Sequence, residues 1–177
     1  MFLYHFEEKR WEQVFRNNRD LPAVEGHSLS MLWDDISGSA KILLFGGYDG
    51  LTMRNDVVLI DLPANAERRV KVLPVTGIRP SGRKFHSAIA AGNFLIVMGG
   101  MSSTSILNDI WTFNLETCVW TEHRSTASIP PICCSGFCAA RVLSSGCSMI
   151  SIGGQTVDES GQRAPVPMDL IEFEFHR

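Results

Sequence analysis

The stretch KILLFGGYDG at residues 41–50 runs from an apolar, strand-like segment into a glycine doublet and an acidic turn. The same arrangement recurs as FLIVMGGMSS at residues 94–103 and as SMISIGGQTV at residues 148–157. The second glycines of the doublets fall at positions 47, 100 and 154, which gives intervals of 53 and 54 residues. A fixed period of this length is the signature of a repeat architecture, so we interpret the doublets first as architecture.

Similar segments surround each doublet in the same order, and we denote the four segments of a unit strands a to d. Strand a is rich in small residues, strand b ends in the doublet, and strand c opens on an aspartate; the last two strand c segments alternate apolar with polar residues. This alternation predicts half-buried strands. The strand a segments are HSLSMLW, HSAIAA and CSGFCAA, and the strand c segments are DVVLIDL, DIWTFNL and DLIEFEF.

The first residues of the chain fit strands c and d of such a unit. MFLYHFEEKRW aligns in phase with IWTFNLETCVW, which places Phe2 and Trp11 at the positions of Trp111 and Trp120. Aromatic side chains that recur at one position of a repeat are expected to fill volume between neighbouring sheets. We therefore interpret these aromatics as packing residues.

A four-stranded unit of about 50 residues with a glycine doublet resembles the kelch repeat, the blade of a family of β-propellers. The likeness covers essentially the whole chain, although valine stands at position 70 where an aromatic is usual. The segment PSGRKFHSA, preceded by PVTGI, is similar to host cell factor and Rab9-effector kelch proteins. The residues that carry the resemblance are Gly46, Gly47, Gly99, Gly100, Gly153, Gly154, Trp11, Trp111 and Trp120.

The resemblance implies an all-β fold, a partial kelch-type propeller of about three and a quarter four-stranded antiparallel blades. We expect two strands in residues 1–15, four in 27–75, four in 86–124, and three in 135–175, where the outer strand is missing. Closed propellers contain about four to eight blades, so residues 1–177 are expected to form one segment of an incomplete ring. Exposed blade edges of this kind favour self-association.

Composition excludes several classes of function. A net charge of −3 without a basic cluster argues against nucleic acid binding. No apolar run approaches the roughly 20 residues of a membrane-spanning helix. The five cysteines are odd in number and form no C-x-x-C pair, which favours a reducing compartment, the cytoplasm or alternatively the nucleus.

The predicted binding face carries the loops between strands b and c and between strands d and a. Because strands alternate in direction, these loops share one face. Arginine, tyrosine and methionine are favoured at interfaces, and arginine can hold a carboxylate through two hydrogen bonds. We expect this face to bind another protein, with an acidic peptide segment as the expected kind; ordinary solvated loop residues are the alternative. The predicted partner-binding residues are Tyr48, Asp49, Met53, Arg54, Arg79 and Lys84.

Arg83 and His86 receive a different interpretation. The kelch resemblance implies that the arginine before the His-Ser strand serves packing between blades, so neither residue is assigned to a ligand. The doublets are not interpreted as phosphate loops, because no helical pattern follows any of them.

Catalysis is the competing class of function, since the resemblance extends to copper radical oxidases and other kelch-like enzymes. Tyr4 and Tyr48 are the only tyrosines, and the histidines show no pair at metal-ligand spacing. Cys133, Cys134 and Cys138 are expected on or near a small-residue strand, where buried cysteine is common. We therefore predict an adaptor or scaffold without catalytic residue, metal or cofactor; the alternative is an accessory propeller of a larger enzyme.

Overall fold

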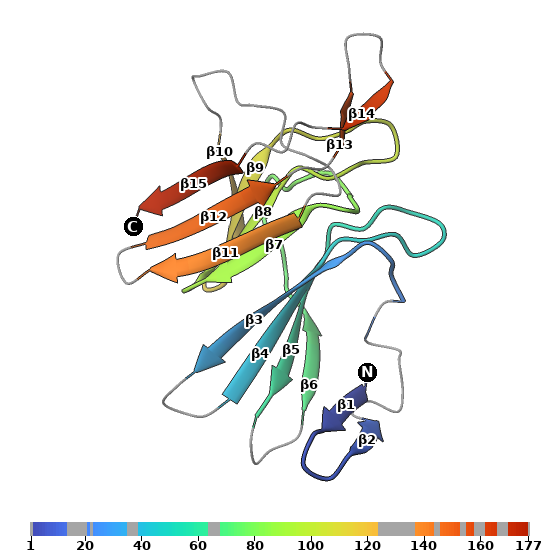
Figure 1. Cartoon of the computed structure of the whole chain (residues 1–177), viewed down its shortest axis with the longest axis vertical. Helices are drawn as coiled ribbons and strands as arrows, with labels where there is room; N and C mark the ends of the chain where they lie inside the picture. Colours follow the sequence, from blue (N-terminus) through green and yellow to red (C-terminus); the bar gives the residue numbers. More distant parts are fainter. Residues whose placement is uncertain are drawn as a thin grey trace.

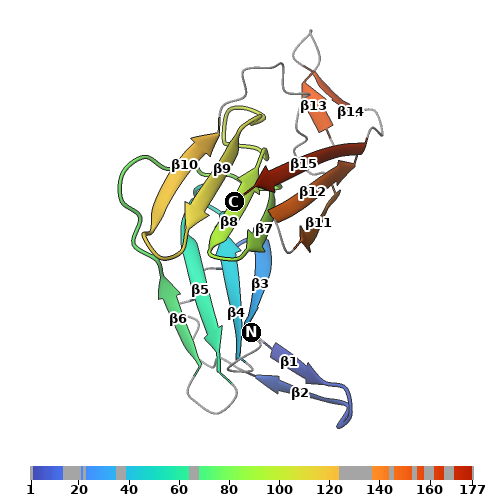
Figure 2. The ribbon, with the colours of Figure 1, turned by 90° about the vertical axis from the view of Figure 1, so that its left-hand side faces the viewer.

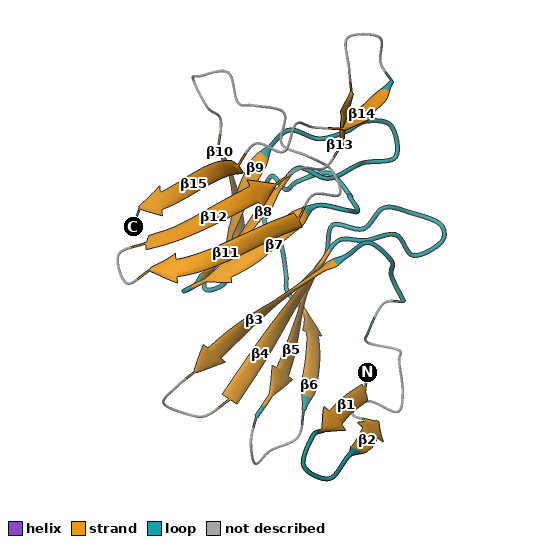
Figure 3. Ribbon diagram, in the orientation of Figure 1, coloured by secondary structure: helices purple, strands orange, loops and turns teal. Residues whose placement is uncertain are grey.

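The computed structural model describes residues 2–13, 21, 23–34, 39–63, 68–123, 137–143, 146–152, 155–157, 162–165 and 170–176. These residues form fifteen strands and no helix (Figures 1 and 3). Every strand pairing is antiparallel. The predicted all-β architecture is confirmed.

Two complete four-stranded sheets form the centre of the molecule, each ordered as its strands follow in the chain. Alternation of side chains along these strands gives each sheet two faces. The first sheet contains β3 (Ser28–Asp34), β4 (Ser39–Phe45), β5 (Val57–Leu62) and β6 (Arg69–Val72). The second sheet contains β7 (Ser87–Ala91), β8 (Phe94–Met98), β9 (Ile110–Asn114) and β10 (Val119–His123).

The third sheet has three strands, and a small hairpin stands inside its b–c loop. This hairpin was not predicted from the sequence. Gly153 and Gly154 lie outside the described residues. The sheet contains β11 (Phe137–Leu143), β12 (Gly146–Ile152) and β15 (Leu170–His176), and the hairpin contains β13 (Gln155–Val157) and β14 (Arg163–Pro165).

The first strands of the three sheets adjoin. β7 contacts both β3 and β11, whereas β6 and β10 lie at the opposite edges of their sheets (Figures 1 and 2). The Ser30 hydroxyl donates to the Ala88 carbonyl oxygen at 3.2 Å and links β3 to β7 directly. The sheets therefore fan out from their a strands, as the blades of a propeller do.

A hydrophobic core lies between the first and second sheets. Ala88 and Ala90 occupy the inner strand β7, where the sheets are closest. Trp120 on the outer strand β10 is 2% exposed, and its ring lies 5.2 Å from Phe45 and 5.0 Å from Phe113. Small inner and large outer side chains thus fill a gap that widens outward.

The glycine doublet of the first sheet lies where the chain leading to β7 crosses the end of β4. Gly46 and Gly47 have φ angles of +65° and +95°, in the region that favours glycine. A Cβ atom on Gly46 would lie 2.8 Å from the carbonyl oxygen of Arg83, and the Gly47 N–H donates to that oxygen at 2.8 Å. Both the backbone conformation and the close approach therefore require glycine here.

The N-terminal hairpin of β1 (Phe2–His5) and β2 (Arg10–Gln13) forms a separate two-stranded sheet. Arg68 donates to Glu12 at 2.8 Å and connects the hairpin to the first sheet. Trp11 was predicted to pack like Trp120, but it is 68% exposed and contacts Tyr4 of its own hairpin. The difference arises because the described residues pair no a and b strands with this hairpin.

Candidate partner-binding loops

The b–c loops of the first and second sheets are braced by backbone pairing to the segment that precedes strand a. In the first unit, Tyr48 forms bridges with Glu25 and with Met53. In the second unit, Met101 forms the equivalent bridges with Lys84 and Ile106. The paired N–H to oxygen distances between Glu25 and Tyr48 are 3.0 and 2.9 Å. These loops are consequently ordered by contacts within the chain itself.

A buried ion pair holds the second of these loops. Arg83 is fully buried, and its guanidinium donates to both carboxylate oxygens of Asp109, at 2.6 and 2.8 Å. It also donates to the Gly99 carbonyl oxygen at 2.8 Å. Burial by itself raises the pKa of Asp109, but hydrogen bonds and charge from Arg83, with the Trp111 indole, lower it overall. Arg83 thus has structural partners on all sides and is not placed to bind a ligand.

The first loop is held by Arg54, which was predicted to bind a partner. Its guanidinium donates to Asp56 at 2.8 Å and to Asp49 at 3.2 Å. Backbone N–H groups of Thr52 and Leu51 also bond Asp49 and, together with Arg54, lower the pKa of its carboxyl to about 2. Arg54 and Asp49 therefore stabilise their own loop, which leaves Arg54 fewer free donors for a partner carboxylate.

Lys84 lies at the centre of a mixed aromatic and charged cluster. Its ammonium nitrogen is 5.1 Å from the centre of the Tyr48 ring and 4.9 Å from that of Phe85, distances at which cation–π attraction operates. Glu25 accepts a hydrogen bond from Lys84 at 3.0 Å, yet the Glu25 side chain is 66% exposed. Phe85 has a φ angle of +57°, which is uncommon for an aromatic residue and holds its ring beside Lys84.

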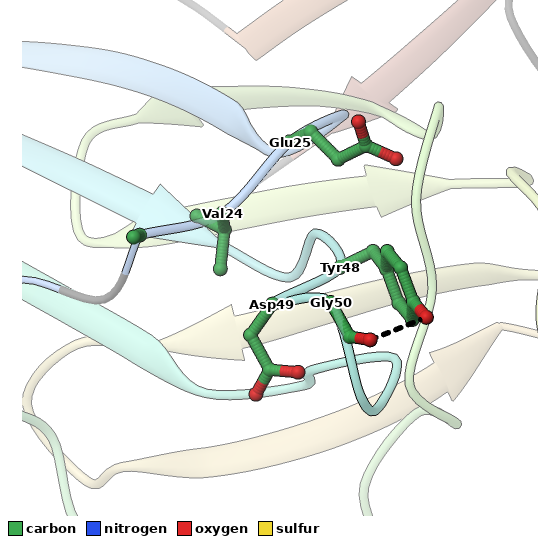
Figure 4. Close-up of a pocket in the computed structure, with 6 residues that line it drawn as sticks. Val24, Glu25, Tyr48, Asp49 and Gly50 are labelled. Carbon is green, nitrogen blue, oxygen red and sulfur yellow. Dashed lines mark hydrogen bonds between the residues drawn. The ribbon is translucent and has the colours of Figure 1, made fainter.

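A shallow pocket of about 430 Å³ adjoins this cluster. The Tyr48 hydroxyl donates to the Gly50 carbonyl oxygen at 2.8 Å and fixes the ring at one side of the pocket (Figure 4). Its lining residues are Ala23, Val24, Glu25, Tyr48, Asp49 and Gly50. The pocket therefore combines an apolar wall with two carboxylates at its rim.

Arg79 belongs to the same face through its backbone. The Asn55 side chain donates to the Pro80 carbonyl oxygen at 2.9 Å, which ties the Arg79 segment to the first b–c loop. Arg79 is exposed and has no ion-pair partner in the part of the chain that the structure describes. Met53, by contrast, is half-buried beside the chain at Gly82.

Sequence reasoning missed Glu25 and Phe85. Glu25 precedes His27 by two residues, as Lys84 precedes His86, so the repeat alignment contained the signal for Glu25. Phe85 could not be found in this way, because its importance depends on its backbone conformation. The structure thus brings together Tyr48, Asp49, Met53, Arg54 and Lys84, with Glu25 and Phe85 added.

Within the described ranges, no three histidine, cysteine, aspartate or glutamate side chains gather as metal ligands. His86 is buried with its Nε2 atom 2.8 Å from the Ser28 hydroxyl, and burial with nearby Arg83 lowers its pKa to about 3. Cys133 and Cys134 lie outside the described residues. The described residues also contain no helix with the length and apolar character needed to span a bilayer.

A family model described as the KLHDC2/KLHL20/DRC7 Kelch-repeats domain matches residues 1–176. The chain belongs to this kelch-repeat family. The kelch resemblance and the partial-propeller fold class are therefore confirmed. The finer likeness to host cell factor and Rab9-effector proteins stays a prediction.

Several curated proteins resemble this kelch chain. It is 31% identical over 111 residues to the tRNA wybutosine-synthesizing protein 2/3/4 of Arabidopsis thaliana, covering 60% of the chain and 11% of that protein. It is 27% identical to the Drosophila melanogaster homolog of leucine-zipper-like transcriptional regulator 1, covering 95% of the chain and 16% of that protein. Human Kelch domain-containing protein 10 is 27% identical, with 86% of the chain and 34% of that protein covered. The chain spans about a third or less of the length of these relatives.

Proposed function

We propose that this kelch chain is a protein-interaction module, an adaptor or scaffold, that binds its partner through the face formed by the b–c and d–a loops. Membership of the kelch-repeat family supports the general class, since such repeats generally mediate protein interactions. One observation carries the particular site. Lys84 is held between Tyr48 and Phe85, while its carboxylate partner Glu25 has a side chain that is mostly exposed to solvent.

The partner we propose is an acidic peptide segment. A carboxylate of the peptide takes the place of Glu25 on Lys84, and Arg79 supplies a second, exposed cation. Displacing Glu25 costs little, because ion pairs with an exposed member contribute about 0–1 kcal/mol. Tyr48 and Phe85 offer apolar contact beside the charge, and the wall of the pocket at Val24 accepts a small apolar side chain.

Preorganisation explains how a small site of this kind can bind usefully. The loop that carries Tyr48 is paired to Glu25 through its backbone and is held by the ion pairs of Arg54. Binding then orders few additional residues, and less conformational entropy is lost. In this proposal Asp49, Met53 and Arg54 support the platform, while Tyr48, Arg79 and Lys84 contact the partner.

The test is an array of acidic peptides, each matched by a peptide with glutamine for glutamate, probed with the 177-residue chain. We expect salt-sensitive binding that prefers the acidic members and falls about tenfold or more in the Arg79→Ala, Lys84→Ala double variant. The matched control is Arg69→Ala, Lys71→Ala, which removes the same charges from the exposed strand β6. Equal binding by both double variants would show that Arg79 and Lys84 do not bind the peptides.

The second candidate is an accessory propeller that positions substrate for a larger enzyme. The Arabidopsis relative favours it, because that protein is named as a synthesizing protein and is much longer than the matched region. Sequencing the transcript tests both, since a catalytic domain encoded beside the blades would favour the enzyme and an adaptor module would favour the scaffold. We propose that the 177 residues themselves form one non-catalytic propeller segment.

Self-association and location in the cell are two further parts of the proposal. We propose that copies of the chain self-associate through exposed parts of the first and last blades, where strands such as β3 and β15 stand at sheet edges. We also propose a cytoplasmic location, with the nucleus as the alternative, on the basis of the cysteine content. Fractionation of cells that express the tagged full-length protein tests the location.

A further inference from the structure

An apolar stripe runs along one face of β3. Leu29, Met31 and Trp33 alternate along this strand and are 58%, 64% and 58% exposed. The opposite face of β3 is occupied, because Ser28 bonds His86 and Ser30 bonds the carbonyl oxygen of Ala88. The second sheet therefore fixes the strand from behind and presents the stripe outward.

The equivalent positions in the second sheet hold small side chains that pack in the core, instead of large exposed ones. Counted from His27 and His86, Leu29 and Met31 correspond to Ala88 and Ala90. Those alanines pack within the core between the two sheets, where inner strands come close. Leucine and methionine would separate two inner strands at that spacing. Another blade could therefore not bring its inner strand as close to β3 as the inner strands of the first and second sheets are to each other.

The middle part of the same face, on β4 and β5, is already covered. Leu44 and Ile42 pair across from Leu29 and Met31 and so share their face. Further out, Val58 and Ile60 are 1% and 2% exposed. Leu21 and Val24, which precede β3, pack on this cluster. Val72 of β6, which pairs with Val58, is 54% exposed at the outer edge of this face, so the covered residues of β4 and β5 separate it from the stripe. The occupant of the stripe is therefore a narrow element that contacts β3.

We propose that the stripe is the contact through which two copies of this chain associate, with a two-fold axis passing beside Met31. Residues two apart on a strand are about 6.7 Å apart, so Leu29 and Trp33 lie at equal distances from Met31. A two-fold axis there sets Met31 against its symmetry mate and each Trp33 against a Leu29. The contact between Trp33 and Leu29 then occurs twice, once on each side of the axis, as an isologous interface requires.

Charge and area support a second copy over other occupants. The stripe carries no charged side chain, so its contact with itself brings no like charges together and offers nothing to an acidic or basic peptide. Three side chains of this size and exposure present on the order of 300 Å² per copy. That area is below the standard size of a stable interface, so the dimer forms weakly and depends on protein concentration.

The inference rests on the self-association part of the proposed function and is independent of peptide binding. Sedimentation velocity of the 177-residue chain at increasing concentrations measures it. We expect a reversible dimer in the wild type, and dissociation constants raised at least about tenfold in Met31→Glu and in Trp33→Gln. Leu51→Glu is the matched control, because Leu51 is 89% exposed on a loop away from β3 and its variant should dimerise normally.

A second readout keeps the test independent of variant folding. With residue 31 on the axis, Met31→Cys cross-links to itself on mild oxidation above the background of the wild type, whereas Leu51→Cys does not. A wild type that stays monomeric at every concentration overturns the inference. So does a dimer that withstands folded Met31→Glu or Trp33→Gln, or a Met31→Cys chain that does not cross-link. Peptide binding should be unchanged in Met31→Glu, so a failure of the dimer inference can be distinguished from a failure of the loop site.

Discussion

The first and second units each contain an aspartate at the same repeat position, but arginines from different segments bind the two carboxylates. Asp56 and Asp109 stand at equivalent positions, directly before β5 and β9. The fully buried Arg83 comes from the lead-in segment before β7 to bind Asp109, and valine stands at the corresponding place, Val24, in the first unit. There the half-exposed Arg54 of the b–c loop binds Asp56 instead.

This comparison shows that an ion pair at one repeat position can either stabilise the contact between blades or order a single loop. The ion pair of Arg83 and Asp109 lies where the chain also bonds the first sheet, through the N–H of Arg83 and the carbonyl oxygen of Arg54. Breaking it disturbs the contact between blades. The ion pairs of Arg54 lie within one loop and affect mainly the platform that carries Tyr48.

Removal of Arg83 should produce the largest effect. Arg83→Met leaves Asp109 half-buried without its cation, so the free energy of unfolding should fall by about 3 kcal/mol. The equivalent change in the first unit, Arg54→Met, should cost less than about 1 kcal/mol, because that pair is partly exposed. Urea unfolding followed by circular dichroism measures both. Equal losses in the two variants contradict the comparison.

The aromatic positions of the outer strands give the next effect. Trp120→Ala should lower the free energy of unfolding by about 3 kcal/mol or more, because it empties the core between the sheets. Trp11→Ala, at the equivalent position of the hairpin, should change it by less than about 0.5 kcal/mol, since Trp11 is mostly exposed. A large loss from Trp11→Ala would mean that another sheet covers the hairpin in solution.

The pH dependence of stability should reveal the buried histidine of the second unit. The pKa of His86 is lowered to about 3 in the folded protein, so the unfolded chain, with a pKa near 6.5, binds the proton first. The contribution of neutral His86 is complete above pH 6.5 and is lost as the pH falls toward 3. Between pH 6.5 and 5 the loss should be about 1 to 2 kcal/mol.

Thermal and urea unfolding across this range, compared with His86→Gln, tests the assignment. The variant should show a smaller slope than the wild type, whatever its stability at neutral pH. His27→Gln, at the equivalent position of the first sheet, is the control. A wild-type slope that persists in His86→Gln assigns the effect to other groups.

The smallest effect should be local and confined to the first loop. Asp49→Ala removes the acceptor for the N–H groups of Leu51 and Thr52. Their amide hydrogen exchange should accelerate while exchange in β4 and β8 stays unchanged, because the sheets do not depend on this contact. Exchange that accelerates throughout both sheets would show that the loop is coupled to the core.

Much of the fold could be predicted from the sequence, and the parts that could not have physical reasons. The doublets, the aspartates and the periodicity located the strands of the first two sheets, because alternation and glycine conformation are local properties. The β13–β14 hairpin escaped prediction because its pairing arises inside a long loop without a repeat. The exposure of Trp11 escaped because burial depends on which sheet lies opposite, which the repeat pattern does not encode.

The candidate site was predicted less completely for a similar reason. Loop position alone placed Tyr48, Arg54 and Lys84 on one face, but it could not show that Arg54 is bound by Asp49 and Asp56. Nor could it show that Lys84 lies between two rings, one of which depends on the positive φ of Phe85. Residue type predicts what a side chain can bind, whereas the tertiary contacts decide whether it is still free.

The central claim is that the loop face of this kelch chain binds acidic peptide segments, and chemical shift mapping tests it most directly. The probe is the acidic peptide that binds best in the array, titrated into the isotopically labelled chain. The account predicts amide shift changes concentrated in residues 23–26, 47–54 and 78–85, and absent from the same titration with the glutamine-substituted peptide. Saturable binding that shifts only the sheet faces, or no saturable binding by any acidic peptide, would contradict it.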